Sequence, residues 1–202
     1  MKKILYLLLF IISIITSCST RSSKELIESA DTKVKAGEYN DAIVDYNKAL
    51  EQDTGNVLAM WNRGNAKVLL QDFKGAVLDY NMVIQRRPSN SNAYLCRGIC
   101  LKLVNDYPGA IKDLDKVIKL DSNNSNAYQL RGFCKMNLND QDAALADLNK
   151  AIELDPKLPD AYLTRGILKL KTGLTQEACS DLTEASGLGK KEADDLIKKN
   201  CK

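Results

Sequence analysis

The 202-residue sequence contains no histidine. Histidine is the commonest general base and the commonest metal ligand in proteins, so its absence removes the usual route to acid–base catalysis and to a metal centre. The chain also has no G-x-S-x-G motif, no P-loop and no dinucleotide-binding fingerprint. We therefore expect a protein that is not an enzyme and that binds no cofactor and no metal.

The sequence also lacks a strong excess of charge of either sign. It has 29 basic and 26 acidic residues, and two of the basic ones, Lys2 and Lys3, lie at the extreme N-terminus. Setting these two aside leaves 27 basic against 26 acidic residues, spread along the chain. Nucleic-acid binding needs a basic patch or stripe that neutralises phosphates, so we expect no nucleic-acid partner.

No apolar run is long enough to cross a membrane. The longest, Ile4 to Ile15, has 12 residues, whereas a transmembrane helix needs about 20. It follows the basic lead Met1-Lys2-Lys3, an order that is typical of an export signal. The small pair Thr16-Ser17 directly before Cys18 resembles the lipobox of bacterial lipoproteins. A plain signal peptide with a chance cysteine is the alternative.

The lipobox resemblance implies a processed, lipid-anchored protein. Residues 1–17 would be the signal peptide, Cys18 the diacylglycerylated, palmitate-bearing mature N-terminus, and residues 18–23 a short tether. More than one acyl chain on one residue gives stable anchoring. Ser19, with no acidic cluster after it, is similar to the outer-membrane class that faces the periplasm. We therefore expect the bacterial cell envelope, at the outer membrane.

The sequence does contain a 34-residue unit that occurs five times. Ser91-Asn92-Ala93-Tyr94 returns unchanged as Ser125-Asn126-Ala127-Tyr128, and Arg97-Gly98 returns as Arg131-Gly132. The units span residues 23–56, 57–90, 91–124, 125–158 and 159–192. Position 8 is always glycine or alanine and position 20 always alanine, whereas position 24 is tyrosine or leucine. Small residues at two fixed positions let two helices cross closely.

This pattern resembles the tetratricopeptide repeat, including the prolines Pro88 and Pro156 at the turn after the second helix. The resemblance implies an all-α, right-handed superhelical solenoid with a helix A and a helix B per unit over residues 24–189. Residues 190–202 are predicted to form a capping helix, because Ala193, Leu196 and Ile197 have helical spacing. The pattern departs from the family at position 11, where lysine replaces a large apolar residue at Lys33, Lys67, Lys135 and Lys169.

The resemblance also implies a ligand groove on the concave side, formed by positions 2, 5, 9, 12 and 13 of the A helices. The residues that we assign to this protein-binding groove are Trp61, Asn65, Asn92, Leu95, Ile99, Asn126, Gln129, Phe133, Leu163 and Ile167. The alternative is that many of them only pack between neighbouring A helices. The lysine and asparagine clamp of chaperone-binding relatives is not matched, so a C-terminal acidic tail is not the expected ligand.

Taken together, these features favour a lipid-anchored scaffold or adaptor that binds another protein or a peptide segment. The alternative is a homo-oligomeric assembly factor of the envelope, in which a second copy of the chain closes the groove.

One arginine and one aspartate recur per unit at positions 7 and 23. They are Arg63, Arg97, Arg131 and Arg165, with Asp45, Asp79, Asp113 and Asp147, and Asp181 in the last unit. We interpret them as a structural charge ladder and not as an anion-binding row of arginines. Because the first unit has Asp45 but Ser29 in place of arginine, we predict that each arginine reaches the aspartate of the preceding unit, which leaves Asp181 to the cap.

The cysteines outside the leader fall into two groups. The turn at residues 186–189 folds the last helix B and the cap antiparallel, which predicts a disulfide between Cys179 and Cys201 at their far ends. Export places this pair where disulfides persist, and two unpaired thiols are the alternative. Cys96, Cys100 and Cys134 fall on A helices, where we expect buried, inert thiols, with a three-thiol metal site as the alternative.

Overall fold

A computed structural model describes residues 21–201, and in that range it contains helices and no strands. The signal peptide and the lipidated Cys18 predicted from the sequence lie outside the described residues. Of the helices that are described, none combines the length and the apolar character that a membrane span needs. The helices are α2 (Ser23–Lys35), α3 (Tyr39–Gln52), α4 (Val57–Leu69), α5 (Phe73–Arg86), α6 (Ser91–Leu103), α7 (Tyr107–Leu120), α8 (Ser125–Asn137), α9 (Gln141–Leu154), α10 (Pro159–Lys171), α11 (Thr175–Gly187) and α12 (Glu192–Asn200).

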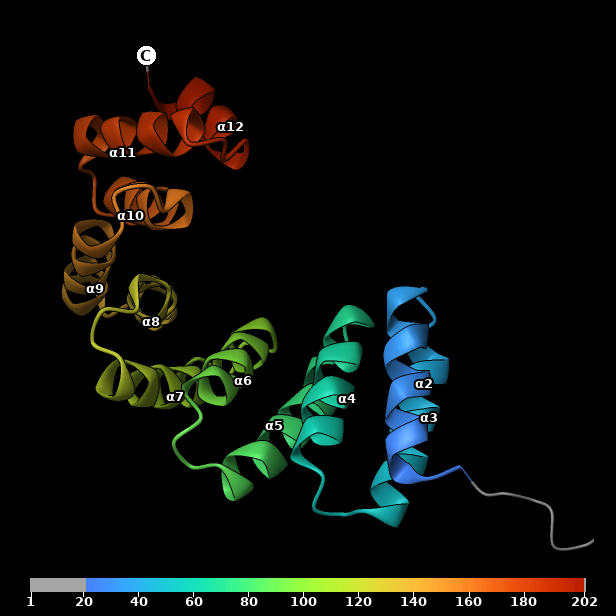
Figure 1. Cartoon of the computed structure of the whole chain (residues 1–202). Coiled ribbons are helices and arrows are strands. Elements are labelled where there is room, and N and C mark those ends of the chain that lie inside the picture. The colour runs from blue at the N-terminus through green and yellow to red at the C-terminus, as the bar shows by residue number, and fades with distance from the viewer. Residues whose placement is uncertain (1–20, 202) are drawn as a thin grey trace, which may run out of the picture.

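The helices form a curved stack of hairpins (Figure 1). The even-numbered helices α2 to α10 are the A helices, and each begins at the first residue of a 34-residue unit. The odd-numbered helices α3 to α11 are the B helices and lie on the outer side of the arc, whereas the A helices line its hollow. The most extensive contacts join helices that are consecutive in the chain. The all-α solenoid expected from the sequence is confirmed.

Side-chain caps fix where the helices begin. The A helices α4, α6 and α8 are each preceded by an asparagine whose side chain accepts a hydrogen bond from a first-turn N–H. The B helices α5, α7 and α9 follow Asp72, Asp106 and Asp140, which accept from first-turn N–H groups in the same way. Each cap satisfies a donor that has no partner inside its helix.

The core is a row of crossing points between A and B helices. The position-20 alanines, Ala42, Ala76, Ala110, Ala144 and Ala178, are fully buried. The position-24 side chains beside them, Tyr46, Tyr80, Leu114, Leu148 and Leu182, are at most 1% exposed. Alternating small and large residues thus let the paired helices approach while the space next to each crossing stays filled.

The C-terminal turn differs from the sequence-based prediction. Helix α11 continues to Gly187, and the capping helix begins at Glu192 rather than at residue 190. The reason is the turn at Gly189, whose φ of +92° favours glycine. The N–H of Gly189 donates to the carbonyl of Ser186 and that of Lys190 to the carbonyl of Ala185, which closes α11.

A disulfide fastens the capping helix to the last unit. Cys179 in α11 is bonded to Cys201 after α12, with the two Cα atoms 5.7 Å apart. Between the two cysteines, Ala193 of α12 is buried against Leu182 and Ala185 of α11. The cap therefore covers the apolar face that the last repeat would otherwise expose.

Candidate functional site: the concave groove

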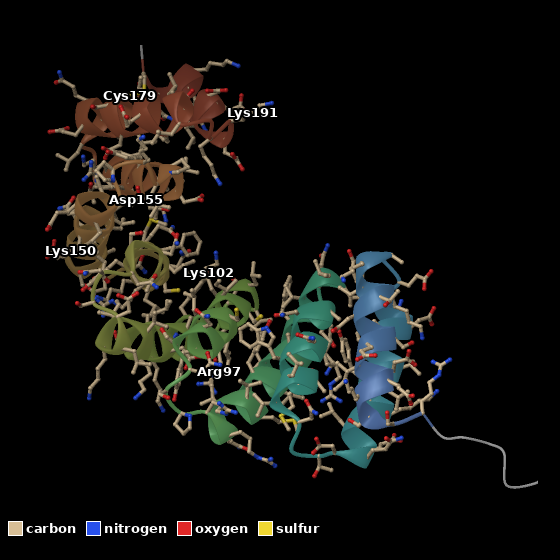
Figure 2. The ribbon with its side chains drawn as sticks, viewed as in Figure 1. Arg97, Lys102, Lys150, Asp155, Cys179 and Lys191 are labelled. Atoms are coloured by element: carbon tan, nitrogen blue, oxygen red, sulfur yellow. A yellow bond between two sulfur atoms is a disulfide. The ribbon has the colours of Figure 1, made fainter. Side chains whose placement is uncertain are left out.

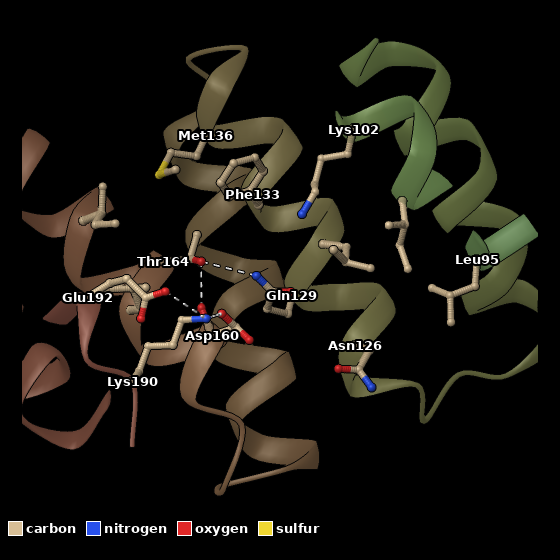
Figure 3. Close-up of a pocket in the computed structure, with 14 residues that line it drawn as sticks. Leu95, Lys102, Asn126, Gln129, Phe133, Met136, Asp160, Thr164, Lys190 and Glu192 are labelled. Atoms are coloured by element: carbon tan, nitrogen blue, oxygen red, sulfur yellow. Dashed lines mark hydrogen bonds and ion pairs between the residues drawn. The ribbon is translucent and has the colours of Figure 1, made fainter. Parts of the chain in front are cut away.

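A groove of about 480 Å³ crosses the concave side of the last three units (Figure 3). Helices α6, α8 and α10 supply its floor, and the turn before α12 closes one end. Of the ten residues assigned to the groove from the sequence, seven line it, namely Leu95, Ile99, Asn126, Gln129, Phe133, Leu163 and Ile167. Five of these seven are apolar, so the floor is suited to hydrophobic side chains of a ligand.

Gln129 has a different role from its neighbours in the groove. Its side chain is buried, and its Nε2 atom donates a hydrogen bond of 3.3 Å to the Oγ1 atom of Thr164. Thr164 in turn donates to the backbone carbonyl of Asp160 at 2.7 Å. The amide of Gln129 therefore holds α8 against α10, which is the packing role that the sequence left open.

The two ends of the groove differ in charge. At one end the Nζ atom of Lys102 lies 5.1 Å from the centre of the Phe133 ring, and no carboxylate among residues 21–201 forms an ion pair with it. At the other end Lys190 contacts Asp160 at 2.6 Å, and this hydrogen bond raises the pKa of Lys190. The groove thus offers one uncompensated cation, Lys102, beside an aromatic ring.

The sequence assignment did not include Thr164, Lys190 and Glu192, which also line the groove. Thr164 lies one residue outside the periodic groove positions. Lys190 comes from the turn before α12, whose path depends on Gly189, and Glu192 is the first residue of α12. The sequence provided a partial indication for Lys190, because it has helical spacing with Ala193 and Ile197 and so lies on the same side of the capping segment.

The remaining three assigned residues lie outside this groove. Trp61 and Asn92 border a separate hollow of about 460 Å³ at the edge of the second and third units. The Trp61 ring packs against Tyr80, with ring centres 5.4 Å apart. Asn65 accepts a hydrogen bond of 2.8 Å from the Tyr80 hydroxyl and borders two smaller hollows. The ten residues therefore divide between several hollows.

Of the three cysteines on the A helices, Cys100 and Cys134 are buried as expected, whereas Cys96 is only partly buried. Cys96 and Cys100 line an apolar hollow of about 290 Å³, and Cys134 is fully buried in α8. Burial raises the pKa of Cys100 to about 12 and that of Cys134 to about 11, so both thiols are protonated at neutral pH. No group of three or more potential metal ligands occurs within residues 21–201.

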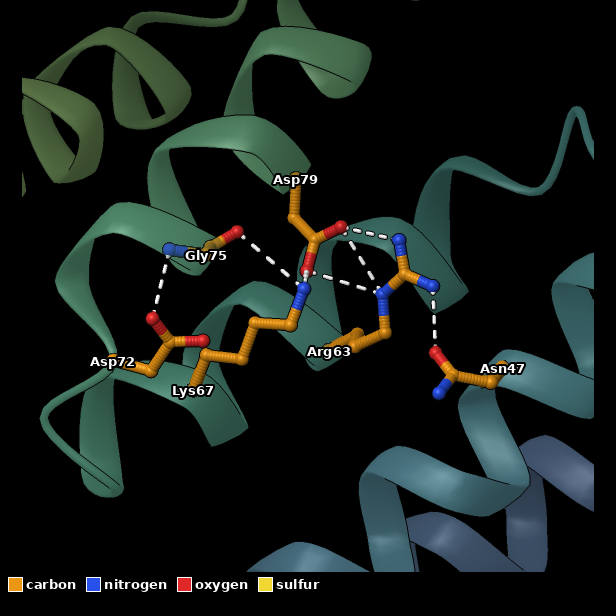
Figure 4. A network of polar contacts seen from close by, with 6 residues as sticks. All are labelled: Asn47, Arg63, Lys67, Asp72, Gly75 and Asp79. Atoms are coloured by element: carbon orange, nitrogen blue, oxygen red, sulfur yellow. Dashed lines mark hydrogen bonds and ion pairs between the residues drawn. The ribbon is translucent and has the colours of Figure 1, made fainter.

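The charge ladder has a different register from the predicted one. Each arginine pairs with the aspartate of its own unit, as in Arg63–Asp79 (Figure 4), and not with that of the preceding unit. The same contact joins Arg97 to Asp113, Arg131 to Asp147, and Arg165 to Asp181. Because helices A and B of a unit cross at position 8, position 7 lies beside position 23 of the same unit. Asp181 therefore pairs with Arg165 and is not left to the cap.

The arginine does reach the preceding unit, but through position 25. The Nη1 atom of Arg63 donates to Asn47 at 2.7 Å, and Arg97, Arg131 and Arg165 contact Asn81, Asp115 and Asn149 in the same way. In the first unit Asp45 instead accepts hydrogen bonds from Ser29 at 2.7 Å and from Lys33 at 2.5 Å.

The position-11 lysines, which depart from the repeat pattern, complete the ladder. Lys67 contacts Asp79 at 2.8 Å, and Lys135 and Lys169 contact the aspartates of their units at the same distance. Each of these buried carboxylates therefore faces two cations. The third unit has Leu101 at position 11, and Asp113 pairs with Arg97 alone.

Comparison with known proteins agrees with this architecture. A family model described as TPR repeat matches residues 30–71 and 135–173. A search of curated proteins found no match to this chain. Among solved structures, the chain is similar to MamA, with 23% identity, a TM-score of 0.76, and coverage of 85% of this chain and 94% of that one.

Two further similar structures are of peptide-binding proteins. One is YrrB, "a TPR protein with an unusual peptide-binding site", with 24% identity, a TM-score of 0.69, and coverage of 81% and 84%. The other is the first TPR of Spaghetti (RPAP3) bound to the HSP90 peptide SRMEEVD, with 28% identity, a TM-score of 0.54, and coverage of 58% and 93%. The repeat period, the helical stack and these matches lead to one conclusion: the chain has the fold of a tetratricopeptide-repeat solenoid, and the repeat family's own model matches residues 30–71 and 135–173.

Proposed function

We propose that this protein is a non-catalytic interaction scaffold whose concave groove holds a peptide segment of a partner protein. The observation that carries the proposal is the groove of about 480 Å³ with an apolar floor and polar ends. Such a surface buries hydrophobic side chains while a few polar groups fix the orientation of the ligand. The peptide-binding site described for YrrB and the peptide bound to RPAP3 support this function for a similar fold.

The lining indicates which segment the groove prefers. Leu95, Ile99, Leu163 and Ile167 offer aliphatic contacts, and Phe133 offers an aromatic face. Lys102 is the cation that a carboxylate of the ligand would contact, because Lys190 is already paired with Asp160. We therefore propose a mostly apolar segment that carries one acidic group at the Lys102 end.

We also propose that the scaffold is anchored by lipid at the bacterial cell envelope, at the outer membrane and facing the periplasm. The support is the basic lead, the apolar run and the lipobox-like Thr16-Ser17-Cys18. Helix α2 begins at Ser23, so only four residues would separate it from the lipidated cysteine. Fully extended they reach on the order of 15 Å, which would keep the solenoid close to the membrane surface.

The groove is tested by Phe133→Ala, with Leu138→Ala as the matched control at an exposed position outside the groove. Partner capture from native membranes is quantified by mass spectrometry for the wild type and both variants. We expect Phe133→Ala to weaken capture by about 1 kcal/mol or more, because interfaces concentrate energy in a few desolvated anchors. Leu138→Ala should leave it unchanged.

Thermal unfolding of the same variants separates binding from folding. Loss of capture in proportion to a collapse of stability would return Phe133 to a purely structural role. Light-scattering mass is measured alongside, because a second copy of the chain in the groove is the competing occupant. A stable dimer that dissociates on Phe133→Ala would replace the peptide proposal with self-assembly.

The anchor is tested by Cys18→Ser. If the cysteine is acylated, this variant should retain the leader, fail to incorporate a fatty-acid label and migrate more slowly than the mature protein. Thermal unfolding should stay unchanged, because residue 18 precedes the solenoid that begins at α2. Normal processing and unchanged membrane association of the variant would contradict lipid anchoring.

A further inference from the structure

A basic cleft of about 460 Å³ lies on the opposite side of the stack from the concave groove. Helix α7 contributes Lys112, Lys116 and Lys119, helix α6 contributes Tyr94 and Arg97, and helix α5 contributes Ile84. Arg97 is seen in Figure 2 on the outer side of the arc, away from the hollow that the A helices line.

The lysines carry the free charge of this cleft. Arg97 is occupied, since it donates to Asp113 at 2.7 Å and to Asn81 at 2.5 Å. Asp115, the other carboxylate in the lining, is paired with Arg131 at 2.6 Å. The three lysines of α7 form no ion pair with any residue in the range 21–201. The cleft therefore has three uncompensated ammonium groups.

These lysines are not a requirement of the repeat. They occupy positions 22, 26 and 29, where the second unit has Leu78, Met82 and Gln85 and the fifth has Ser180, Glu184 and Gly187. The first and fourth units each have one lysine there, and that of the fourth, Lys150, is paired with Glu153 at 2.7 Å. A residue needed for packing or stacking would recur, so the three-lysine stripe needs another explanation.

We propose that this cleft is a second interaction site and binds an acidic segment of a partner protein. Lys112 and Lys119 are seven residues apart on α7, so the stripe extends over about 10 Å. The charges are therefore spaced along a line, which matches several carboxylates of one peptide better than a single compact anion. The proposal is independent of the ligand in the concave groove.

The rest of the lining favours a peptide over a phosphate group. Phosphate is bound most effectively by arginine forks and by free N–H groups at helix N-termini. Here the guanidinium of Arg97 is already paired, and none of the lining residues lies within the first three positions of its helix. The Tyr94 ring, 5.9 Å from the Nζ atom of Lys116, and the side chain of Ile84 provide contacts for residues between the carboxylates.

The test is fluorescence anisotropy with the full chain in neutral detergent and a fluorescein-labelled octaglutamate peptide as probe. The triple variant Lys112→Gln, Lys116→Gln, Lys119→Gln removes the stripe. The control triple variant Lys24→Gln, Lys157→Gln, Lys199→Gln removes the same charge from exposed positions elsewhere. We expect the first to weaken binding about tenfold, as the loss of three exposed ion pairs implies, and the second less than about twofold.

Further arms of the experiment separate the alternatives. Phe133→Ala should leave octaglutamate binding unchanged, which distinguishes this site from the concave groove. Equal weakening by both triple variants, or no binding of the wild type, would overturn the proposal. So would displacement of the peptide by inorganic phosphate where chloride of equal ionic strength has no effect, because the cleft would then be a phosphate site.

Discussion

At the scale of single residues, the solenoid depends on buried carboxylates that each satisfy a fixed set of donors. Asp79 is 1% exposed and contacts both Arg63 and Lys67. The net free energy of such a pair is small, because desolvation of the charges offsets much of their attraction. Its main effect is to fix the position of helix A relative to helix B of one unit and, through the second arm of the arginine, relative to the unit before.

Asp79→Asn should therefore be strongly destabilising, because two cations with low exposure lose their counter-charge. We expect a loss of about 3–5 kcal/mol in the free energy of unfolding. The matched control is Asp115→Asn, since the Asp115 side chain is 55% exposed and three other units have asparagine at this position. It should cost less than about 1 kcal/mol. Urea denaturation measures both, and similar losses would show that the ladder is not a buried clamp.

The sequence correctly predicted that the position-7 arginines pair with the position-23 aspartates, but it assigned each arginine to the wrong unit's aspartate. Counting one aspartate more than arginines suggested pairing between units, because the first unit lacks an arginine. Because helices A and B cross at position 8, each arginine instead pairs with the aspartate of its own unit. In the first unit, Ser29 and Lys33 donate hydrogen bonds to Asp45. Only the distance between helices inside a unit, which a periodic pattern does not contain, could have settled the register.

At the scale of helices, the space between helices A and B at position 8 differs from unit to unit. A Cβ atom added at Gly132 would lie 2.9 Å from Leu148 Cγ and 3.1 Å from the carbonyl oxygen of Ala144. At Gly98 the nearest atom to such a Cβ, on Asp113, is 3.5 Å away, which is ordinary van der Waals contact. The same repeat position thus has no room for a methyl group in the fourth unit but accommodates one in the third.

Gly132→Ala and Gly98→Ala should accordingly have opposite effects on stability. At Gly132 the methyl group forces the helices apart, and we expect a loss of about 1–3 kcal/mol. At Gly98 the helix gains roughly 0.5–1 kcal/mol from the reduced freedom of the unfolded chain. Thermal unfolding followed by circular dichroism measures the difference. A destabilised Gly98→Ala variant would contradict the spacing of the helices in the third unit.

The sequence predicted the helix pairs well because two signals agree. Small residues at positions 8 and 20 mark the crossings, and the 34-residue period transfers each helix pair to the next unit. The capping segment belongs to no repeat, so its start was misplaced by two residues. The sequence also predicted one continuous groove, whereas the assigned residues line separate hollows. The repeat pattern does not show which side chains fill the space between neighbouring A helices, as Trp61 does by packing against Tyr80.

At the scale of the whole molecule, the two ends of the solenoid are protected to different extents. Contacts are concentrated between neighbouring helices, so local stability depends on whether a unit has a neighbour on each side. The C-terminal unit is covered by α12, which the Cys179–Cys201 disulfide holds in place. Within residues 21–201 no helix precedes α2, and the first unit has Ser29 where the others have arginine.

Hydrogen exchange should therefore show that the first unit opens before the last. In oxidised protein we expect amides of α2 and α3 to exchange faster than those of α10 and α11, as measured by mass spectrometry of peptic fragments. Reduction should accelerate exchange in α11 and α12 and leave α2 unchanged, because the closed loop with a sequence separation of 22 stabilises only the C-terminal end. Its chain-entropy contribution is about 3 kcal/mol, so the shift is large enough to detect. Equal exchange of both ends before reduction would show that the cap does not protect the last unit.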